Sequence, residues 1–447
     1  AKAGATCLRL IATLVEDDVV EMMVPFVTTY ISSDNWRHRE AAVMAFGAVL
    51  EGPSMKKLAN LVHSAMPVLI NLMKDGHVMV KDSATWTIGK ICELHGPSIP
   101  NEVLTPLVEA LLLALDDSPS VCSKACFALH NFGEQFEGGK DEPTNALSAY
   151  LSPLVQKLLM VVQKDDGGDA NMRSEAVEAM NVLIKNSAKD MRPVVQSTLD
   201  VVLSLLERTF SMQVLTADDR DRVQGLQSLL CGNIQVICLK MESDVAPFAD
   251  RIMTMVLEVF KNKQAVAQEE AFMAAGALAD QLEKRFINYM EAFQPILVQG
   301  LSNHEEFQAR CVCIVTVGVV GDLCRALEGE IRPYTDMIMT LLLQNLENAS
   351  INRNVKPPVL ACLGDIALAI GPGFQAYLQV TMNMLEQAQQ ACRVSEGQDE
   401  EMVDYINSLR EGVLEAYSGI AQGLNEQGNN QMTQLIPYLP GIVAFLE

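Results

Sequence analysis

The sequence has few aromatic side chains and no sustained alternation of apolar and polar residues. Phe, Trp and Tyr make up 5% of the 447 residues, whereas Met, Leu, Ala and Val are plentiful. This composition favours helices over sheets, and no segment alternates for long enough to indicate a strand. The sequence therefore predicts an all-α protein.

The chain is also short of positive charge and of long apolar runs. Lys and Arg number 33 against 56 Asp and Glu, which gives a formal net charge of −23. That charge disfavours binding to nucleic acid or to anionic membranes and favours a basic partner, although it also suits simple solubility. The longest apolar run, residues 311–321, is too short to cross a bilayer.

Motifs of the common enzyme classes are missing. The sequence contains no GxSxG, P-loop, dinucleotide-binding GxGxxG or HExxH motif. Cys122, Cys126 and His130 could line one helix edge, but no fourth zinc ligand accompanies them, and a buried helix edge is the simpler interpretation. The 11 cysteines, several of them inside apolar runs, indicate a reduced intracellular protein. We expect no enzymatic activity, no cofactor and no metal.

What the sequence does contain is an internal repeat. Residues 45–54 (AFGAVLEGPS), 87–98 (TIGKICELHGPS), 319–330 (VVGDLCRALEGE) and 362–373 (CLGDIALAIGPG) each end an apolar helix with a glycine and a breaker. The helices between them often carry a proline, at positions 25, 67, 106, 153, 193, 247, 295 and 333. The period of roughly 40–45 residues is typical of HEAT repeats.

The repeat predicts an α-solenoid superhelix of HEAT repeats, with residues 1–447 as a single continuous solenoid. Each repeat has a first helix, A, and a second helix, B. Pairs are expected at residues 16–52, 54–96, 99–138, 145–187, 189–241, 244–283, 284–327, 328–371 and 372–424. Residues 1–15 should form a lone B helix and residues 430–446 a lone A helix, as in a fragment cut at both ends. Polar loop insertions are expected at residues 163–171, 214–222 and 394–402.

One outward-facing pattern recurs on the predicted B helices. In the helix expected around residues 81–97, Trp86 falls about 150° from the apolar line, among polar residues. When the B helices are aligned on Gly47 and Gly89, Met44 matches Trp86, and Phe127 and Met273 follow in other repeats. Acidic residues precede these positions by one turn or follow them by two. They are Glu40, Glu51, Asp82, Glu93, Glu134, Glu269 and Asp280.

We interpret this pattern as a ladder of binding positions for Lys or Arg side chains. The face of an indole attracts a cation while carboxylates accept its hydrogen bonds. The alternative is that Trp86 packs against the B helix of the neighbouring repeat. Gap-filling between helices likewise explains Met44 and Met273.

Stretches spread over nearly the whole chain carry a family resemblance. They are NWRHREAAVMAFGAVLEGP, WTIGKICEL, LIKNSAKD, LQSLLCGNIQ, YMEAFQPIL, VVGDLCRALEGEIRP, VKPPVLACLGDIALAIG and MVDYINSLREGVLEAYSGIAQGL, in this order. On these stretches the sequence resembles the importin-β (karyopherin-β) family of nuclear import receptors. The resemblance implies a central to C-terminal fragment. It also implies shuttling between cytoplasm and nucleus through the pore at the nuclear envelope, without membrane insertion.

The resemblance also implies partners and binding residues. That family holds a basic helical segment of the adaptor importin-α, or basic cargo signals, on its B helices, and Trp86 with Asp82 and Glu93 matches one such position. Phe127 stands where the family usually has a second tryptophan, so a weaker cation contact is expected. Ran-GTP, bound largely by the preceding half of the receptor, and phenylalanine–glycine nucleoporins are further implied partners. A HEAT scaffold without a transport role remains the alternative. The candidate basic-peptide-binding residues are Met44, Glu40, Glu51, Trp86, Asp82, Glu93, Phe127, Asn131, Glu134, Glu269, Met273 and Asp280.

Overall fold

The computed structural model describes residues 2–164, 170–261, 265–302, 307–392, 400–425 and 431–446. Within these ranges the chain forms α-helices, short 3-10 helices and turns, and no strand. The predicted all-α class is therefore confirmed. The contacts gather in two compact units, residues 1–201 and 202–447, and the single continuous solenoid with its repeat bounds stays a prediction. The boundary falls inside a single helix, α10 (Arg192–Thr209).

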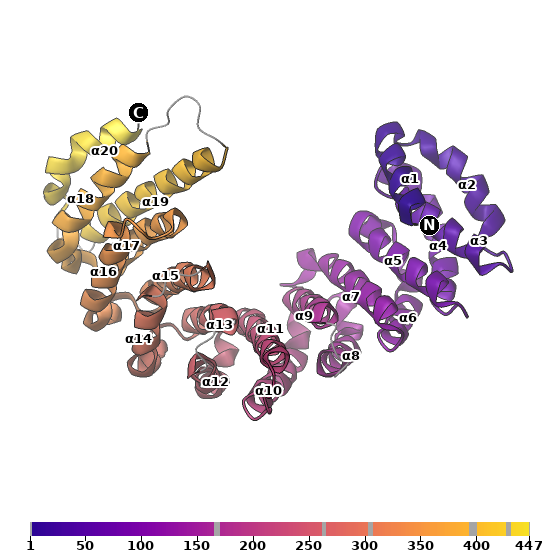
Figure 1. Ribbon diagram of the computed structural model, residues 1–447, viewed down its shortest axis with the longest axis horizontal. Coiled ribbons are helices and arrows are strands. Elements are labelled where there is room, and N and C mark those ends of the chain that lie inside the picture. The colour runs from indigo at the N-terminus through magenta and orange to yellow at the C-terminus, as the bar shows by residue number, and fades with distance from the viewer. Residues whose placement is uncertain are drawn as a thin grey trace. The chain divides into compact units, whose positions relative to one another are not determined.

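The first unit consists of helix pairs stacked in chain order. Helices α3, α5, α7 and α9 pack each on the next and lie side by side, and α2, α4, α6 and α8 are their A helices (Figure 1). The helices are α1 (Lys2–Val15), α2 (Asp18–Tyr30), α3 (Trp36–Ala48), α4 (Met55–Leu72), α5 (Val78–His95), α6 (Leu104–Ala114), α7 (Pro119–Glu134), α8 (Leu151–Gln163) and α9 (Ala170–Lys185).

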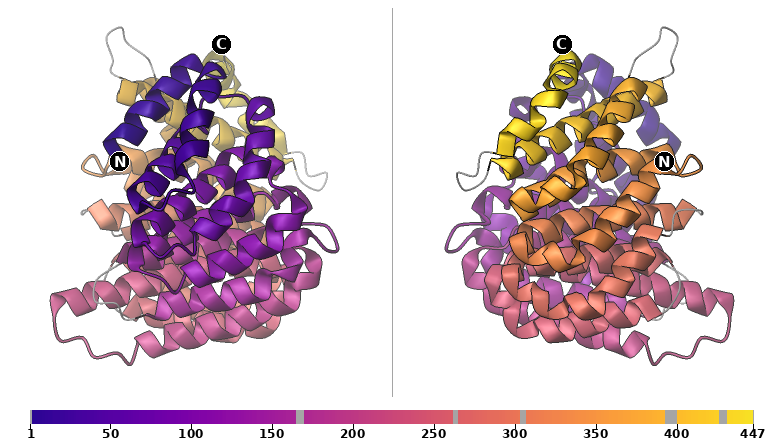
Figure 2. Two further views of the ribbon diagram at one scale, coloured as in Figure 1. Left: turned by 90° about the vertical axis from the view of Figure 1, so that its right-hand side faces the viewer. Right: turned by 90° about the vertical axis from the view of Figure 1, so that its left-hand side faces the viewer.

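The second unit repeats the arrangement. Its B helices α11, α13, α15, α17 and α19 again pack each on the next, and the connection between α10 and α11 projects from the stacked helices (Figure 2). Its helices after α10 are α11 (Ala217–Met241), α12 (Ala249–Lys261), α13 (Ala265–Leu282), α14 (Ile287–Ser302), α15 (Phe307–Leu327), α16 (Arg332–Glu347), α17 (Lys356–Ile370), α18 (Gln375–Ala391), α19 (Glu400–Leu424) and α20 (Leu439–Leu446).

Apolar spacing and end caps explain why these segments are helical. In α12, Ile252, Val256 and Val259 recur every three or four residues and are buried, which is one face of a 3.6-residue period. Burying each such side chain contributes about 1.5–3 kcal/mol. At the start of α3, the Asn35 side chain accepts a hydrogen bond from the Arg37 backbone, which satisfies an amide that has no partner inside the helix.

Two predicted boundaries are wrong for identifiable reasons. Residues 217–222, expected to be part of a polar loop, form the first turns of α11, because Thr216 and Asp219 make a reciprocal capping box. The expected single helix at 430–446 is a 3-10 helix (Gln431–Tyr438) followed by the short α20. Prolines 437 and 440 lack the amide donors that one long helix would need there. Most of the expected insertions at 163–171 and 394–402 lie outside the described residues.

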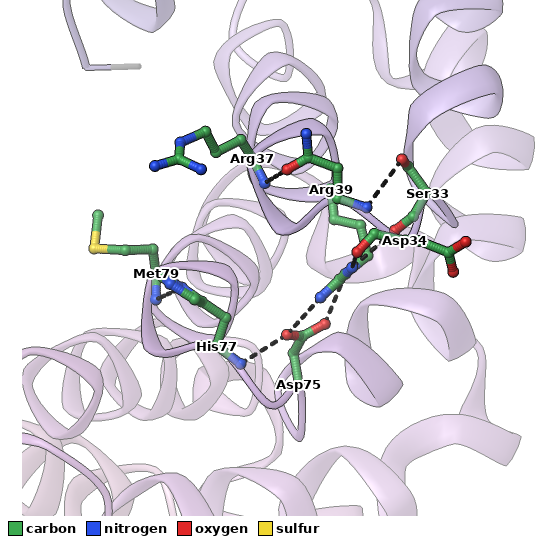
Figure 3. A network of polar contacts seen from close by, with 8 residues as sticks. Ser33, Asp34, Arg37, Arg39, Asp75, His77 and Met79 are labelled. Carbon is green, nitrogen blue, oxygen red and sulfur yellow. Dashed lines mark hydrogen bonds and ion pairs between the residues drawn. The ribbon is translucent and has the colours of Figure 1, made fainter.

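A part-buried ion pair ties the first turn of α3 to the loop before α5 (Figure 3). The Arg39 guanidinium donates to both carboxylate oxygens of Asp75, at 2.8 and 2.9 Å, and its third nitrogen donates to the backbone oxygens of Ser33 and Asp34. Burial opposes ionisation of Asp75, but hydrogen bonds from Arg39 and from the His77 backbone outweigh it and lower the pKa of Asp75. One repeat later, Lys81 pairs with Asp117 in the same way.

One apolar stretch also calls for a structural account. Residues 353–391 include a segment long and apolar enough, by composition, to cross a membrane. In the structure this stretch comprises α17 and α18 with a 3-10 turn at Gly371–Phe374 between them, and it is mostly buried. Packing between repeats accounts for its apolar character.

Candidate functional site

Trp86 packs on the preceding B helix while part of its side chain stays accessible. A carbon attached to the Cα of Gly47 would lie 2.5 Å from Cζ3 of Trp86, so the absence of a side chain on α3 is what admits the indole of α5. Trp86 is nevertheless only half-buried. Packing and exposure, which the sequence presented as alternatives, coexist at this residue.

Phe127 repeats this contact one helix further along. A carbon on Gly89 of α5 would lie 2.5 Å from Cδ1 of the Phe127 ring, and Phe127 is also half-buried. Asn131 donates from its side-chain amide to the backbone oxygen of Phe127 at 2.9 Å. The structure therefore places Trp86 and Phe127 in the same register on adjacent helices, as the alignment on glycines predicted.

Three of the predicted acids in the first unit already have partners within the chain. Glu51 pairs with Arg9 of α1 at 3.1 Å, and Glu93 pairs with Lys90 of its own helix at 2.7 Å. Asp82 accepts a hydrogen bond from the Ser120 hydroxyl of α7. A basic ligand would have to share or displace these contacts.

Three other predicted positions in this unit have different surroundings. Glu40 is 9% exposed and does not form the open position that the pattern predicted. Met44 lines an apolar groove of about 470 Å³ with Leu8 of α1 and Met22 of α2, and none of the residues that line this groove is acidic. Glu134 is half-buried at the last residue of α7.

In the second unit, the predicted residues lie beside a larger groove. Met273 and Asp280 of α13 line a groove of about 610 Å³ that extends across α15 and α17. Glu269 lies one turn before Met273 and is half-buried. The sequence analysis missed three further carboxylates in this groove, Asp322 of α15, Asp365 of α17 and Glu415 of α19.

Asp322 and Asp365 each lie against a glycine of the preceding B helix, as the aromatic rings do in the first unit. A carbon on Gly276 would lie 2.5 Å from Oδ2 of Asp322, and a carbon on Gly321 would lie 2.7 Å from Oδ2 of Asp365. The signal was present in the sequence. The dipeptide Gly-Asp recurs at 321–322 and 364–365, where the glycine was used only to align repeats.

Carboxylates outnumber cationic side chains in the lining of this groove. Burial raises the pKa of Asp322, and the charge of Asp280 raises it further. Burial likewise raises the pKa of Asp280 and of Asp365, against the opposing charge of Arg325. Four carboxylates, those of Asp280, Asp322, Asp365 and Glu415, share the lining of the groove with a single arginine, Arg325. The groove is therefore a favourable place for additional positive charge.

In the described part of the chain, no group of three or more His, Cys, Asp or Glu side chains is placed so that it could bind a metal ion. Cys122 and Cys126 are buried, whereas His130 is half-buried. The Cys126 thiol donates to the sulfur of Cys122, and this hydrogen bond, together with burial, raises the pKa of Cys126. The two thiols satisfy one another inside the core.

Stacked helix pairs of this kind define an α-solenoid, and residues 36–91 match the family described as HEAT-like repeat, which confirms the predicted repeat type. Residues 106–447 match the family described as importin subunit beta-1-like, TPR repeats. The chain belongs to the importin subunit beta-1 family, whose members are not enzymes.

Similar proteins agree over the whole chain. Importin subunit beta-1 of Arabidopsis thaliana is 41% identical over 459 residues, which cover 100% of this chain and 52% of the relative. A crystal structure of importin beta in an ammonium sulfate condition superposes with a TM-score of 0.94 at 33% identity, over 100% of this chain and 51% of that one. The Kap95:Nup1 complex gives a TM-score of 0.88 at 32% identity, over 99% of this chain and 50% of that chain. The chain spans about half the length of these relatives.

Proposed function

We propose that the chain serves nuclear import by binding a basic helical segment, such as that of the adaptor importin-α, on its exposed B-helix faces. The observation that supports this most directly is the outer face of α5. Asp82, Trp86 and Glu93 lie within about 40° of one another around the helix, and the indole is half-exposed. An aromatic face flanked by carboxylates suits a Lys or Arg side chain.

Long-range electrostatics supports the same partner. The net charge of −23 attracts a basic segment and accelerates its encounter with the protein. Individual exposed contacts contribute only about 0.2–1 kcal/mol each. Useful affinity therefore requires many contacts along several repeats, which stacked B helices provide.

Other partners follow from the family. The solved Kap95:Nup1 complex pairs a relative with Nup1, and we propose that phenylalanine–glycine nucleoporins bind A-helix grooves of this chain. Ran-GTP would regulate release in the full-length receptor, with weak or no binding to these 447 residues alone. Location in the cytoplasm and nucleus belongs to the same proposal. A scaffold without transport is the competing function, and it would need no aromatic residues exposed among acids.

Titration calorimetry with a Lys/Arg-rich helical peptide tests the proposal. The basic peptide should bind, a neutral Gln-substituted copy should not, and affinity should fall steeply with salt because exposed charges are screened beyond ~8–10 Å. A Trp36→Phe variant leaves Trp86 as the sole tryptophan, so its fluorescence should change on binding. Equal affinity for both peptides, or affinity that does not vary with salt, would count against basic-segment recognition.

A further inference from the structure

The groove of the second unit already contains a cation of the kind that a basic ligand would supply. Arg325 of α15 lines the groove together with Asp280, Asp322 and Asp365. Its guanidinium hydrogen-bonds to Asp322 three residues earlier in the same helix. A second guanidinium nitrogen lies 3.9 Å from Oδ2 of Asp365 on the next B helix, α17.

This arginine is held more loosely than Arg39 in its part-buried pair with Asp75. Its side chain is 56% exposed, whereas that of Arg39 in its pair with Asp75 is 18% exposed. Its contact with Asp365 is too long for a good hydrogen bond. Asp322 and Asp365 each pack against a glycine of the preceding helix. Their side chains are therefore more firmly fixed than the Arg325 side chain that bridges them.

The surroundings leave negative charge in excess. Asp280 adds a third carboxylate from a third helix, and its charge raises the pKa of Asp322. Glu415 of α19 adds a fourth. An arriving guanidinium or ammonium group would meet carboxylates from α13, α15 and α17 in one groove. In the first unit, Lys90 likewise pairs with an acid three residues away on its own helix, Glu93.

We infer that Arg325 is a built-in competitor that occupies the position of a ligand's basic side chain between Asp322 and Asp365 and swings out when a basic helical segment binds. This inference rests on the proposed function and adds a residue that tunes affinity within the same site. Without Arg325 the groove gains one unit of net negative charge and loses the group that must be displaced. Removal should therefore strengthen binding, the opposite of what loss of a direct ligand contact would do.

The test is titration of the 447-residue chain with the Lys/Arg-rich peptide and its neutral copy at low salt. Arg325→Gln should tighten binding of the basic peptide by about two- to fivefold, the range expected for one exposed ion pair. Arg325→Lys, which keeps the charge, should remain close to the unmodified protein. The matched control is Arg222→Gln on α11, because Arg222 pairs with Asp219 in the same i, i+3 geometry, at 2.7 Å, outside the groove. The control changes net charge equally and should leave affinity nearly unchanged.

Each outcome separates the two proposals. If the unmodified protein binds the basic peptide but Arg325→Gln binds it equally or more weakly, the competitor role is wrong and the proposed function stands. Equal tightening by Arg325→Gln and Arg222→Gln would reduce the effect to net charge and also overturn the competitor role. If the unmodified protein does not bind the basic peptide, both proposals fail. Thermal unfolding of each variant identifies any change in affinity that comes from loss of structure.

Discussion

The indole of Trp86 on α5 rests on the backbone of Gly47 on α3, at a position where even a methyl group would come within 2.5 Å of the ring. The same relationship joins Phe127 to Gly89 on the next pair of helices. Each aromatic ring thus packs against the glycine of the preceding B helix, and the rest of the side chain remains partly accessible to solvent. Such support limits the rotamers available to the ring, which reduces the entropy that a ligand contact would cost.

Filling the space at Gly47 should disturb this arrangement. Gly47→Ala would place a methyl group against Trp86 and 2.6 Å from the Thr87 hydroxyl, so we expect a loss of about 1–3 kcal/mol, as for other overpacked sites. Gly225→Ala is the control, because nothing lies within 4 Å of its position in α11. There, alanine should stabilise the helix by about 0.5–1 kcal/mol. Urea unfolding measures both, and a stabilised Gly47→Ala variant would contradict the packing argument.

Removing the indole tests recognition and packing together. Trp86→Ala should weaken basic-peptide binding by about 0.5–2 kcal/mol, the range of cation–π contacts. It should lower stability by less than the about 3–5 kcal/mol typical of a fully buried aromatic residue. Phe127→Ala should have smaller effects on both quantities. Trp36→Ala is the control, since that ring stacks on His77 at 3.6 Å, at the start of α3, rather than among the candidate residues. Unchanged affinity in folded Trp86→Ala would remove Trp86 from the proposed site.

The fold could be read from the sequence because its signals are local and repeated. A glycine and a breaker close the B helices, and the period between them sets the length of a pair. The error at residues 217–222 arose because charge alone suggested a loop, whereas the capping box from Thr216 to Asp219 depends on a hydrogen bond three residues away. Local composition does not distinguish a solvated helix from a solvated loop.

The candidate site was only partly predictable. The register of Trp86 and Phe127 followed from aligned glycines, because neighbouring repeats share a geometry. The in-chain partners of Asp82 and Asp365 did not, because Ser120 and Arg325 belong to adjacent repeats and reach these acids only at the observed helix spacing. Sequence patterns give the face of a residue, but pairing across repeats depends on packing.

The ion pair between Arg39 and Asp75 should support the first unit in a pH-dependent way. The pKa of Asp75 is lowered in the folded state, so its contribution is present above the unfolded value of about 3.9 and is lost as pH falls through the folded value. Arg39→Met should cost about 1–3 kcal/mol at pH 7, because it leaves a half-buried carboxylate without its partner. Hydrogen exchange of the α3 and α5 amides measures this loss of stability. Protection in Arg39→Met should fall at pH 7 and should fall less at pH 3.

The control for that pair is an exposed one. Lys57 contacts Glu21 at 3.2 Å, where the Glu21 side chain is 82% exposed. Lys57→Met should change stability by no more than about 0.5 kcal/mol. If both variants had equal effects, burial would not be what distinguishes the Arg39 contact.

Backbone strain where a B helix is followed by the next A helix predicts that two substitutions change stability in opposite directions. Glu283 has a φ of 50° and Gly371 a φ of 56°, each directly after a B helix. A side chain disfavours this region, whereas glycine adopts it readily. Glu283→Gly should therefore stabilise the second unit, by about 1 kcal/mol or less once the more flexible unfolded chain is counted. Gly371→Ala should destabilise it by about 1–3 kcal/mol. Thermal unfolding decides this, and two changes of the same sign would refute the strain argument.

Asp322 should lower stability at neutral pH while favouring binding. Its pKa is raised by burial and by Asp280, so the protonated form stabilises the fold, fully below the unfolded pKa of about 3.9, and this stabilisation is lost as pH rises through the folded value. Asp322→Asn removes the charge, yet its amide oxygen can still accept from Arg325. We expect the melting temperature to rise by about 1–4 °C at pH 7, a gain that disappears below about pH 4, and basic-peptide affinity to fall. Asp219→Asn is the opposite control, because hydrogen bonds from Thr216 lower the pKa of Asp219, and its loss should destabilise α11 at pH 7. A lower melting temperature for Asp322→Asn at pH 7 would mean that the carboxylate stabilises the groove and is not held there at a cost to stability.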